Sequence, residues 1–593
     1  MKFWISTKRV AWAATILGAS AIGANADTIY WEGVTGTWGA TTNWTTNPLA
    51  VGSDPVSVPG AGDTIVMNVA GANSSTALQL EGARSAFGIL IASNGNTNVR
   101  GGTSQTLASP VLSLGAGGIT RPVGVTGTGD TSIGSVTVAS QPQDNVIVEL
   151  TANQIWDNSG TDPGGLIRAD GPIRVPSSIS DTNRILTLTG TNTGINHITA
   201  GAAAGLSNGS GSGNTLAIEK TGTGLWIISV PTTTAISGTH TFSGGVTVSQ
   251  GTLSVNGTSS TPTSGVVTSG PLGTGVLMMN GGTLLGSSST AATTSTTNTL
   301  ANNVTFNAVA GSTFRVVNGT TGTSSTTLSG VLGGALGGFT KTGSGVLVLT
   351  NDNTYSGNTV IDAGGLTGAL NLVNASSTNN IPNSPVITVN GILNVTGLQS
   401  GTIALGASQT ITGTGFVNGT IGGAGSVQPG ASPGILFAGA TDPTGGLDYS
   451  FEMTALDPVY ANNLASVNDV LRLTSATTPF TAALDGDNTV TVNFGMALSL
   501  GDVIHGGFFT DLDSDFSSLV SGADWQFTFT GGSLPSGASI VTSVTQVASA
   551  DFFSGTITNG WVTTFTVIPE PTSIVFVSIG IISLGLVRSR CRR

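Results

Sequence analysis

The chain has 593 residues, of which 88 are glycine and only 8% are charged, whereas a typical globular domain carries about a quarter charged residues. Hydrophobic residues make up 38% of the chain, which is too many for a disordered protein. The two ends, residues 1–26 and 570–593, hold seven of the 17 basic residues and one of the 29 acids, so the body between them has 10 basic and 28 acidic residues and a net charge of −18. This charge, with no basic patch to offset it, excludes nucleic acid as a partner.

The start of the chain has the three-part layout of a secretory signal peptide. Residues 2–9 contain three basic side chains and no acid, and residues 10–22 are mainly apolar. Ala24 and Ala26 then provide the small residues of a cleavage site. We therefore expect export by the Sec machinery, cleavage by signal peptidase, and a mature chain that starts at Asp27.

Three tryptophans, Trp31, Trp38 and Trp44, follow at near-regular spacing within residues 27–77. Indole rings at a surface stack on the apolar faces of sugars, so the three residues are candidates for a glycan platform. The alternative is that they plug the open end of a stack of strands, where an exposed core needs a bulky cap. We assign residues 27–77 as an N-terminal cap and keep the platform as the alternative.

Short apolar runs between turn formers recur from residue 78 to residue 447 and predict β-strands. Residues 346–349 (Val-Leu-Val-Leu), for example, lie between two glycines and an Asn-Asp-Asn turn. A strand–turn–strand unit of this kind cannot bury an apolar face alone and must stack on its neighbours. We therefore predict an all-β solenoid over residues 78–447.

One pattern of this region occurs twice. Lys-Thr-Gly-x-Gly stands at residues 220–224 and again at residues 341–345, each time followed by a strand and then by Thr-(Phe/Tyr)-Ser-Gly. The combination resembles the autotransporter-associated β-strand repeat, which is found in passenger regions of bacterial surface proteins. The clearest copies span residues 216–257 and 339–370. The resemblance implies a right-handed parallel β-helix, with roughly 22 residues in each coil.

From residue 448 to residue 566 the composition changes. Phenylalanine is concentrated here, and runs such as residues 525–529 (Trp-Gln-Phe-Thr-Phe) alternate polar and apolar side chains. Such alternation is typical of a sheet with one face in water. We predict a C-terminal β cap or a small β-sandwich.

The last segment, residues 567–593, combines a short motif, an apolar run and a basic tail. These parts are Pro569, Glu570 and Pro571, the apolar run 572–587, and Arg588, Arg590, Arg592 and Arg593. The run is slightly short for a transmembrane helix, and the arginines would remain on the cytoplasmic side. The order of the parts resembles the PEP-CTERM sorting signal, which implies recognition by an exosortase and removal of the tail near the Pro-Glu-Pro motif. A permanent anchor is the alternative.

Motifs for chemistry are scarce. Zinc-site, phosphate-loop and hydrolase patterns are absent from the sequence, and we predict no catalytic residue, no metal and no cofactor. Asp511, Asp513 and Asp515 alternate as in a calcium loop, but Phe516 stands where such a loop needs glycine. A surface turn is therefore the favoured interpretation, with calcium binding as the alternative.

The densest mixed-charge group lies in residues 162–184. A polysaccharide lyase or glycosidase needs clustered acids with a partner on one face, but exposed ion pairs explain such a group equally well. The charged residues of the group are Asp162, Arg168, Asp170, Arg174, Asp181 and Arg184.

We predict an exported, non-enzymatic solenoid with a structural or adhesive role toward surface polysaccharide. The protein would be held first at the inner membrane and then placed at the cell surface or in the extracellular matrix. A carbohydrate-binding adhesin and a β-helix lyase or glycosidase are the alternatives.

Overall fold

The chain divides into two compact units, Met1–Val348 and Leu349–Arg593. The predicted signal peptide and the predicted apolar run 572–587 lie outside the residues that the structure describes. Within the described residues, no helix has both the length and the apolar character needed to cross a bilayer. The computed structural model describes residues 27–33, 35–48, 55, 57–68, 77–101, 110–134, 146–199, 205–229, 239–256, 260–263, 265–286, 296–307, 311–320, 322–364, 367–430, 433–456, 468–475, 479–481, 488–511, 516, 526–550 and 557–569.

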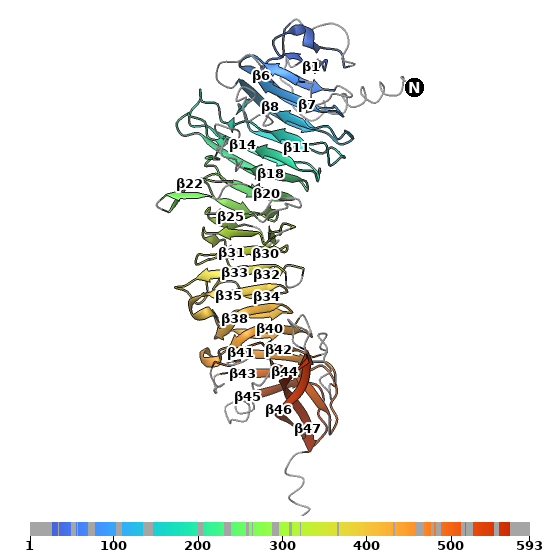
Figure 1. The fold of residues 1–593 in the computed structure, drawn as a ribbon, viewed down its shortest axis with the longest axis vertical. Helices are drawn as coiled ribbons and strands as arrows, with labels where there is room; N and C mark the ends of the chain where they lie inside the picture. Colours follow the sequence, from blue (N-terminus) through green and yellow to red (C-terminus); the bar gives the residue numbers. More distant parts are fainter. Residues whose placement is uncertain are drawn as a thin grey trace, which may run out of the picture. The chain divides into compact units, whose positions relative to one another are not determined.

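The first unit consists of short strands that lie one above another (Figure 1). One sheet, here the β1 sheet, contains 15 strands, and nearly all of its pairs are parallel. Its strands are β1 (Thr28–Trp31), β3 (Trp44–Thr45), β4 (Thr64–Met67), β6 (Arg84–Ile91), β8 (Val111–Arg121), β10 (Ile147–Leu150), β11 (Gln154–Asn158), β13 (Ile173–Arg174), β14 (Asn183–Thr189), β16 (Leu206–Ser207), β17 (Thr215–Lys220), β19 (Val246–Val248), β23 (Leu277–Met279), β26 (Val304–Phe306) and β29 (Leu332–Gly333).

A second sheet of this unit, here the β2 sheet, is also parallel. Its strands are β2 (Gly36–Thr37), β5 (Ala77–Leu80), β7 (Thr97–Gly101), β9 (Thr131–Ile133), β12 (Ile167–Ala169), β15 (Asn196–Thr199), β18 (Leu225–Ser229), β20 (Thr252–Asn256), β24 (Thr283–Leu285), β27 (Ser312–Arg315) and β30 (Phe339–Thr342). Side chains alternate between the interior and the surface, as in β17, where Leu216, Ile218 and Lys220 are buried. This two-residue period explains why the short apolar runs form strands.

Two smaller features complete the first unit. The strands β25 (Thr297–Leu300) and β28 (Ser325–Leu328) pair in parallel and begin a further sheet, and β31 (Val346–Leu349) spans the division between the units. An antiparallel hairpin of β21 (Thr261–Thr263) and β22 (Val266–Ser269) projects from the coils (Figure 1). The 3₁₀-helix η1 (Thr41–Asn43) lies near the N-terminal end.

Most coils of the first unit are longer than the resemblance implied. The pairs Thr97↔Thr131 and Thr283↔Thr313 join residues 34 and 30 positions apart, whereas Ala77↔Asn98 joins residues 21 apart. Loops of different length lie between the strands, and a solenoid accommodates such insertions at its surface without disturbing the ladder. The expectation of roughly 22 residues per coil is therefore too short for most of this unit.

The second unit is also built mainly from parallel strands. One sheet, here the β32 sheet, contains β32 (Thr359–Asp362), β34 (Val386–Val389), β37 (Thr410–Gly413), β39 (Ser426–Pro429), β41 (Asp448–Met453), β43 (Thr489–Phe494) and β45 (Gln526–Gly531). The other, here the β33 sheet, contains β33 (Ala369–Asn374), β35 (Ile392–Leu398), β36 (Thr402–Leu405), β38 (Phe416–Gly423), β40 (Ile435–Thr441), β42 (Val470–Leu473), β44 (Val503–Asp511), β46 (Ala538–Ala550) and β47 (Ile557–Pro569). Two 3₁₀-helices, η3 (Gln399–Gly401) and η4 (Pro443–Gly445), lie in its loops.

The strand ladder passes through residue 448, where we expected a separate C-terminal domain to begin. β41 pairs in parallel with β39, and β42 pairs in parallel with β40. Only the last pairs, β44 with β47 and β47 with β46, are antiparallel. The region after residue 448 therefore extends the solenoid sheets and closes them with a long hairpin, rather than starting a sandwich of its own.

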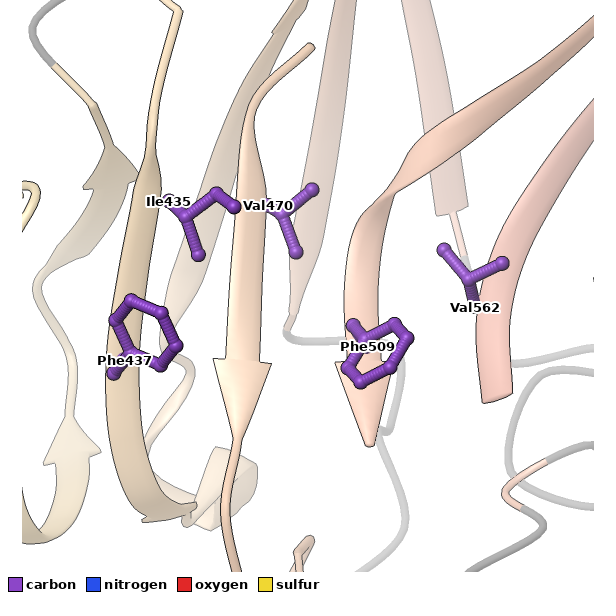
Figure 2. Close-up of a cluster of buried hydrophobic side chains, with 5 residues drawn as sticks. All are labelled: Ile435, Phe437, Val470, Phe509 and Val562. Atoms are coloured by element: carbon purple, nitrogen blue, oxygen red, sulfur yellow. The ribbon is translucent and has the colours of Figure 1, made fainter. Parts of the chain in front are cut away.

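In β40, β42 and β44 both faces of the β33 sheet are buried. One face carries Phe508, whose ring packs against those of Tyr449 and Phe451 at 4.8 and 5.1 Å. The opposite face carries a cluster of five buried apolar side chains from four strands, shown in Figure 2. These are Ile435, Phe437, Val470, Phe509 and Val562. Part of the concentration of aromatic residues after residue 448 thus reflects a sheet that is buried on both faces.

Arg472 belongs to the same face as this cluster and is also buried. It pairs in the ladder with Phe437 on one side and Phe509 on the other. Its guanidinium carbon lies 5.6 and 4.9 Å from the centroids of these two rings. The rings therefore hold a buried cation between them, an arrangement that is favourable because the face of an aromatic ring is electronegative.

Truncating Phe509 tests this packing. The substitution Phe509→Ala leaves a cavity and uncovers one side of Arg472, and we expect it to destabilise the second unit by about 3–5 kcal/mol. Leu500→Ala is the matched control, because Leu500 is 53% exposed in the same unit. Thermal unfolding and hydrogen exchange of β40 to β47 measure the effect. Equal shifts for the two variants would show that the cluster does not stabilise this end.

Candidate functional site

The three N-terminal tryptophans are buried in the core of the first unit. Trp31, Trp38 and Trp44 each have 0% of their surface exposed. The rings of Trp38 and Trp44 meet edge to face at 5.2 Å, and the Trp44 indole N–H donates to the Trp38 carbonyl at 2.9 Å. Trp31 lies opposite Trp44 in the antiparallel pair of β1 and β3.

This geometry does not match the glycan platform. A sugar stacks on the open face of a ring, and these indoles expose none of their surface. The Trp38 N–H is also occupied, since it donates to the carbonyl of Pro59 at 3.3 Å. Full burial fits the other interpretation of the sequence, in which the three tryptophans plug the end of the strand stack.

The mixed-charge group of residues 162–184 is divided between the two sheets. Arg168 belongs to β12 of the β2 sheet, with Asp170 just after it. Arg174 belongs to β13 of the β1 sheet, where it makes a two-point contact of 2.8 and 3.1 Å with Glu149 of β10. The group therefore does not converge on one place, as a lyase or glycosidase site would require.

The other three members serve local structure. The Arg184 guanidinium donates to the backbone carbonyls of Leu150 and Thr151 on the preceding coil. Asp162 accepts the N–H of Gly164 within its own turn. The N–H of Asp181, a residue with a φ of 50°, donates to the Ser212 carbonyl.

One compact charged group remains on the β2 sheet, and sequence reasoning identified only part of it. Arg168 lies 3.4 Å from Asp130 on the preceding coil and 4.0 Å from Asp170. On the following coil it pairs in the ladder with His197. Asp130 and His197 were missed because they lie 38 and 29 residues from Arg168, and only the register of the coils brings them together.

Burial sets the protonation of this group. It raises the pKa of the Asp170 carboxyl to about 6, although the nearby Arg168 cation acts in the opposite direction. Burial, with a further contribution from Arg168, lowers the pKa of His197 to about 4, so the imidazole is neutral at pH 7. A carboxyl with a pKa near 6 is suited to proton transfer, but Asp170 is 4% exposed. The arrangement therefore links three successive coils, and the Asp170 carboxylate is largely inaccessible to a ligand.

The two lysines of the repeated pattern are buried, and they are the only lysines between residues 27 and 569. Lys220 ends β17, and its ammonium donates to the backbone carbonyls of Thr221, Gly222 and Gln250 at 2.5, 2.7 and 3.1 Å. The first two carbonyls belong to the turn after the strand, and the third belongs to the next coil. The side chain therefore ties a turn to its neighbour in the stack.

Lys341 repeats this arrangement at the second copy. Its ammonium donates to the carbonyls of Thr342 and Gly343 at 3.1 and 2.6 Å. Gly343 has a φ of 80°, a left-handed conformation that favours glycine. Burial lowers the pKa of both lysines to about 8. The Lys-Thr-Gly pattern thus specifies a turn whose backbone carbonyls accept hydrogen bonds from a buried lysine ammonium.

The two copies use the same turn on different sheets. Lys220 lies in the β1 sheet and the strand after its turn, β18, lies in the β2 sheet. Lys341 lies in β30 of the β2 sheet, and its turn leads to β31. The pattern therefore specifies how the chain turns a corner and does not fix which sheet the strands join.

The remaining predicted sites lie mostly outside the described residues. Pro569 is the exposed last residue of β47, whereas Glu570, Pro571, Ala24, Ala26 and the four C-terminal arginines lie outside them. Asp511 ends β44, and Asp513 and Asp515 are again outside. The described residues contain no group of three or more His, Cys, Asp or Glu side chains placed to hold a metal ion.

Comparison with known proteins identifies the repeat. The family model described as passenger-associated-transport-repeat matches residues 218–255 and 339–367. These segments coincide with the two predicted copies, so the prediction of an autotransporter-associated repeat is confirmed. Neither the curated proteins nor the solved structures gave a match to the chain. The repeat and the parallel all-β fold together fit a β-helical surface or passenger protein, and the repeat implies that the protein is secreted or displayed at a surface.

The repeat lysine is open to a direct test. Lys341→Met keeps an apolar stem of similar length but removes the donor to Thr342 and Gly343. Because buried carbonyls without a donor are costly, we expect a loss of about 1–3 kcal/mol of stability. Arg315→Met is the control, since Arg315 is exposed and lies opposite Thr342 in the ladder. Hydrogen exchange of residues 339–349 gives the local stability, and unchanged protection in Lys341→Met would contradict the proposed turn.

Proposed function

We propose that this chain is an exported, right-handed β-solenoid that serves as non-enzymatic structural or adhesive material at the cell surface or in the extracellular matrix. The observation that carries the proposal is the pair of passenger-associated repeats, each built on the same buried-lysine turn within a parallel stack. Such a stack presents long, regular faces without a large core. Between residues 27 and 569 these faces carry few charges, and most of those charges are negative.

Sorting would follow from the two ends of the sequence. The Sec machinery and signal peptidase would export the chain and remove residues 1–26. The apolar run 572–587 would then hold the precursor at the inner membrane until an exosortase acts at Pro569-Glu570-Pro571. In support of this order, β47 ends at an exposed Pro569, so the motif begins at the last residue of the last described strand. A cut there would release the solenoid with all of its described strands intact.

Mass spectrometry of the protein from cells that contain an exosortase tests this route. We expect a chain that begins at Asp27, ends near Pro569 to Pro571 and occurs in the surface or extracellular fraction. The variant Glu570→Ala, which alters the motif outside the described strands, should accumulate with its tail attached. An intact tail in the unaltered protein would instead indicate a permanent anchor.

Incubation with surface polysaccharides tests the non-enzymatic role. We expect no shortening of the polysaccharide, and retention on an immobilised glycan would select the adhesive over the purely structural role. Release of short oligosaccharides that is lost in Asp170→Asn would overturn the proposal. Arg174→Gln is the matched control, because Arg174 lies on the other sheet and pairs with Glu149.

A further inference from the structure

The last hairpin leaves one long strand edge without a partner among the described residues. β46 pairs with β47 in 13 consecutive antiparallel pairs, from Ala538↔Pro569 to Ala550↔Ile557. β46 is also the outermost strand of its sheet within the described part of the chain. An edge of this kind presents a row of backbone N–H and C=O groups that a further strand can join.

β46 lacks the features that usually protect an edge. Proteins shorten edge strands or place lysine, proline or inward charges on them. β46 has 13 residues, none of them charged and none of them proline, and six are β-branched. The side chain of Val541 is 43% exposed. By contrast, the outermost strand β3 of the β1 sheet has only two residues.

The sequence of β46 is nearly symmetric about its centre. Read outward from Val544, an antiparallel copy would place Val541 opposite Val547 and Val544 opposite itself. Thr542 would face Gln546 and Ser543 would face Thr545 in the same register. From Val541 to Val547 the partners are thus alike in polarity, and valine would meet valine at three positions, a kind of β-branched pair that stabilises antiparallel strands. The strand is thus complementary to itself around a two-fold axis.

Charge also favours this edge over other surfaces. The body carries a net charge of −18, so two copies repel each other over most of their surface. β46 contributes no charge, and pairing along it brings no like charges into opposition. A second copy therefore meets no direct like-charge repulsion between the paired strands.

We propose that β46 pairs antiparallel with β46 of a second copy of the chain, about a two-fold axis through Val544. The pair would extend the β33 sheet into a continuous sheet shared by two molecules, as a closed, isologous contact. A contact of a single strand pair is small, and it favours dimers where the local concentration is high. This contact does not depend on the sorting route, and its partner is a second copy of the same chain.

Single-cysteine crosslinking tests the register. The full chain carries Cys591→Ser and is purified in detergent, so that residues 572–587 do not themselves drive association. In this background Val544→Cys would place two thiols opposite each other in the dimer. Mild oxidation should shift most of the protein to the mass of two chains. Thr542→Cys is the matched control, because four residues of register separate it from its own copy, about 14 Å along the strand. It should remain a monomer, and Thr542→Cys/Gln546→Cys should crosslink.

A charge variant supplies a second measurement that does not depend on disulfides. Val544→Lys would place two ammonium groups face to face and should abolish the dimer seen by sedimentation, while the unaltered chain should associate more strongly as added salt screens the charge of the body. Equal crosslinking of Val544→Cys and Thr542→Cys, a monomer under all conditions, or crosslinking to a different protein would each overturn the proposal. Failure of the sorting experiment would leave this result unaffected.

Discussion

The structure depends on one constraint, which is that a single coil of short strands cannot bury its own interior side chains. Each inward residue is covered by the equivalent residues of the coils before and after it, so burial and hydrogen bonding pass from coil to coil. Polar interior residues follow the same rule. Thr97 and Thr131 bond through their hydroxyls at 2.8 Å, and Asn158 donates to Asn196 at 2.6 Å, each across one coil. Where this support stops, a different kind of packing is needed: in the first unit β1 and β3 carry buried tryptophans, and in the second unit the sheet ends in a long hairpin.

Features that depend on residues close together in the sequence could be predicted. The short apolar runs between turn formers predicted the strands, and the Lys-Thr-Gly pattern predicted both copies of the repeat. Contacts between coils could not be predicted in the same way, because the loops between strands differ in length. Arg168 lies beside Asp130 and His197 only because of the register of three coils. The same uncertainty made Arg174 look like a neighbour of Asp170, although Arg174 lies in β13 of one sheet and Asp170 follows β12 of the other.

The region after residue 448 shows a second limit of sequence reasoning. Its phenylalanines suggested a new domain, but the parallel ladder continues through it. Alternation in residues 525–529 did indicate a face in water, since Thr528 of β45 is exposed and β43 alternates in the same way. The neighbouring sheet differs, because β40, β42 and β44 are covered on both faces and carry aromatic residues on each. Alternation reports how one strand divides its side chains between two faces. Whether the second face meets water depends on what packs over it, which no local pattern contains.

The buried repeat lysines have a consequence for covalent chemistry at the surface. Lys220 and Lys341 are the only lysines between residues 27 and 569, and both have 0% of their surface exposed. The side chains of the body therefore offer no accessible primary amine to an acyl donor, whereas its carboxyl groups outnumber its cations. An enzyme or reagent that forms amide bonds would therefore react with the carboxyl groups of the body far more readily than with its lysine side chains. Any amide linkage through the side chains of the body would thus run from its carboxyl groups to amines supplied by another molecule.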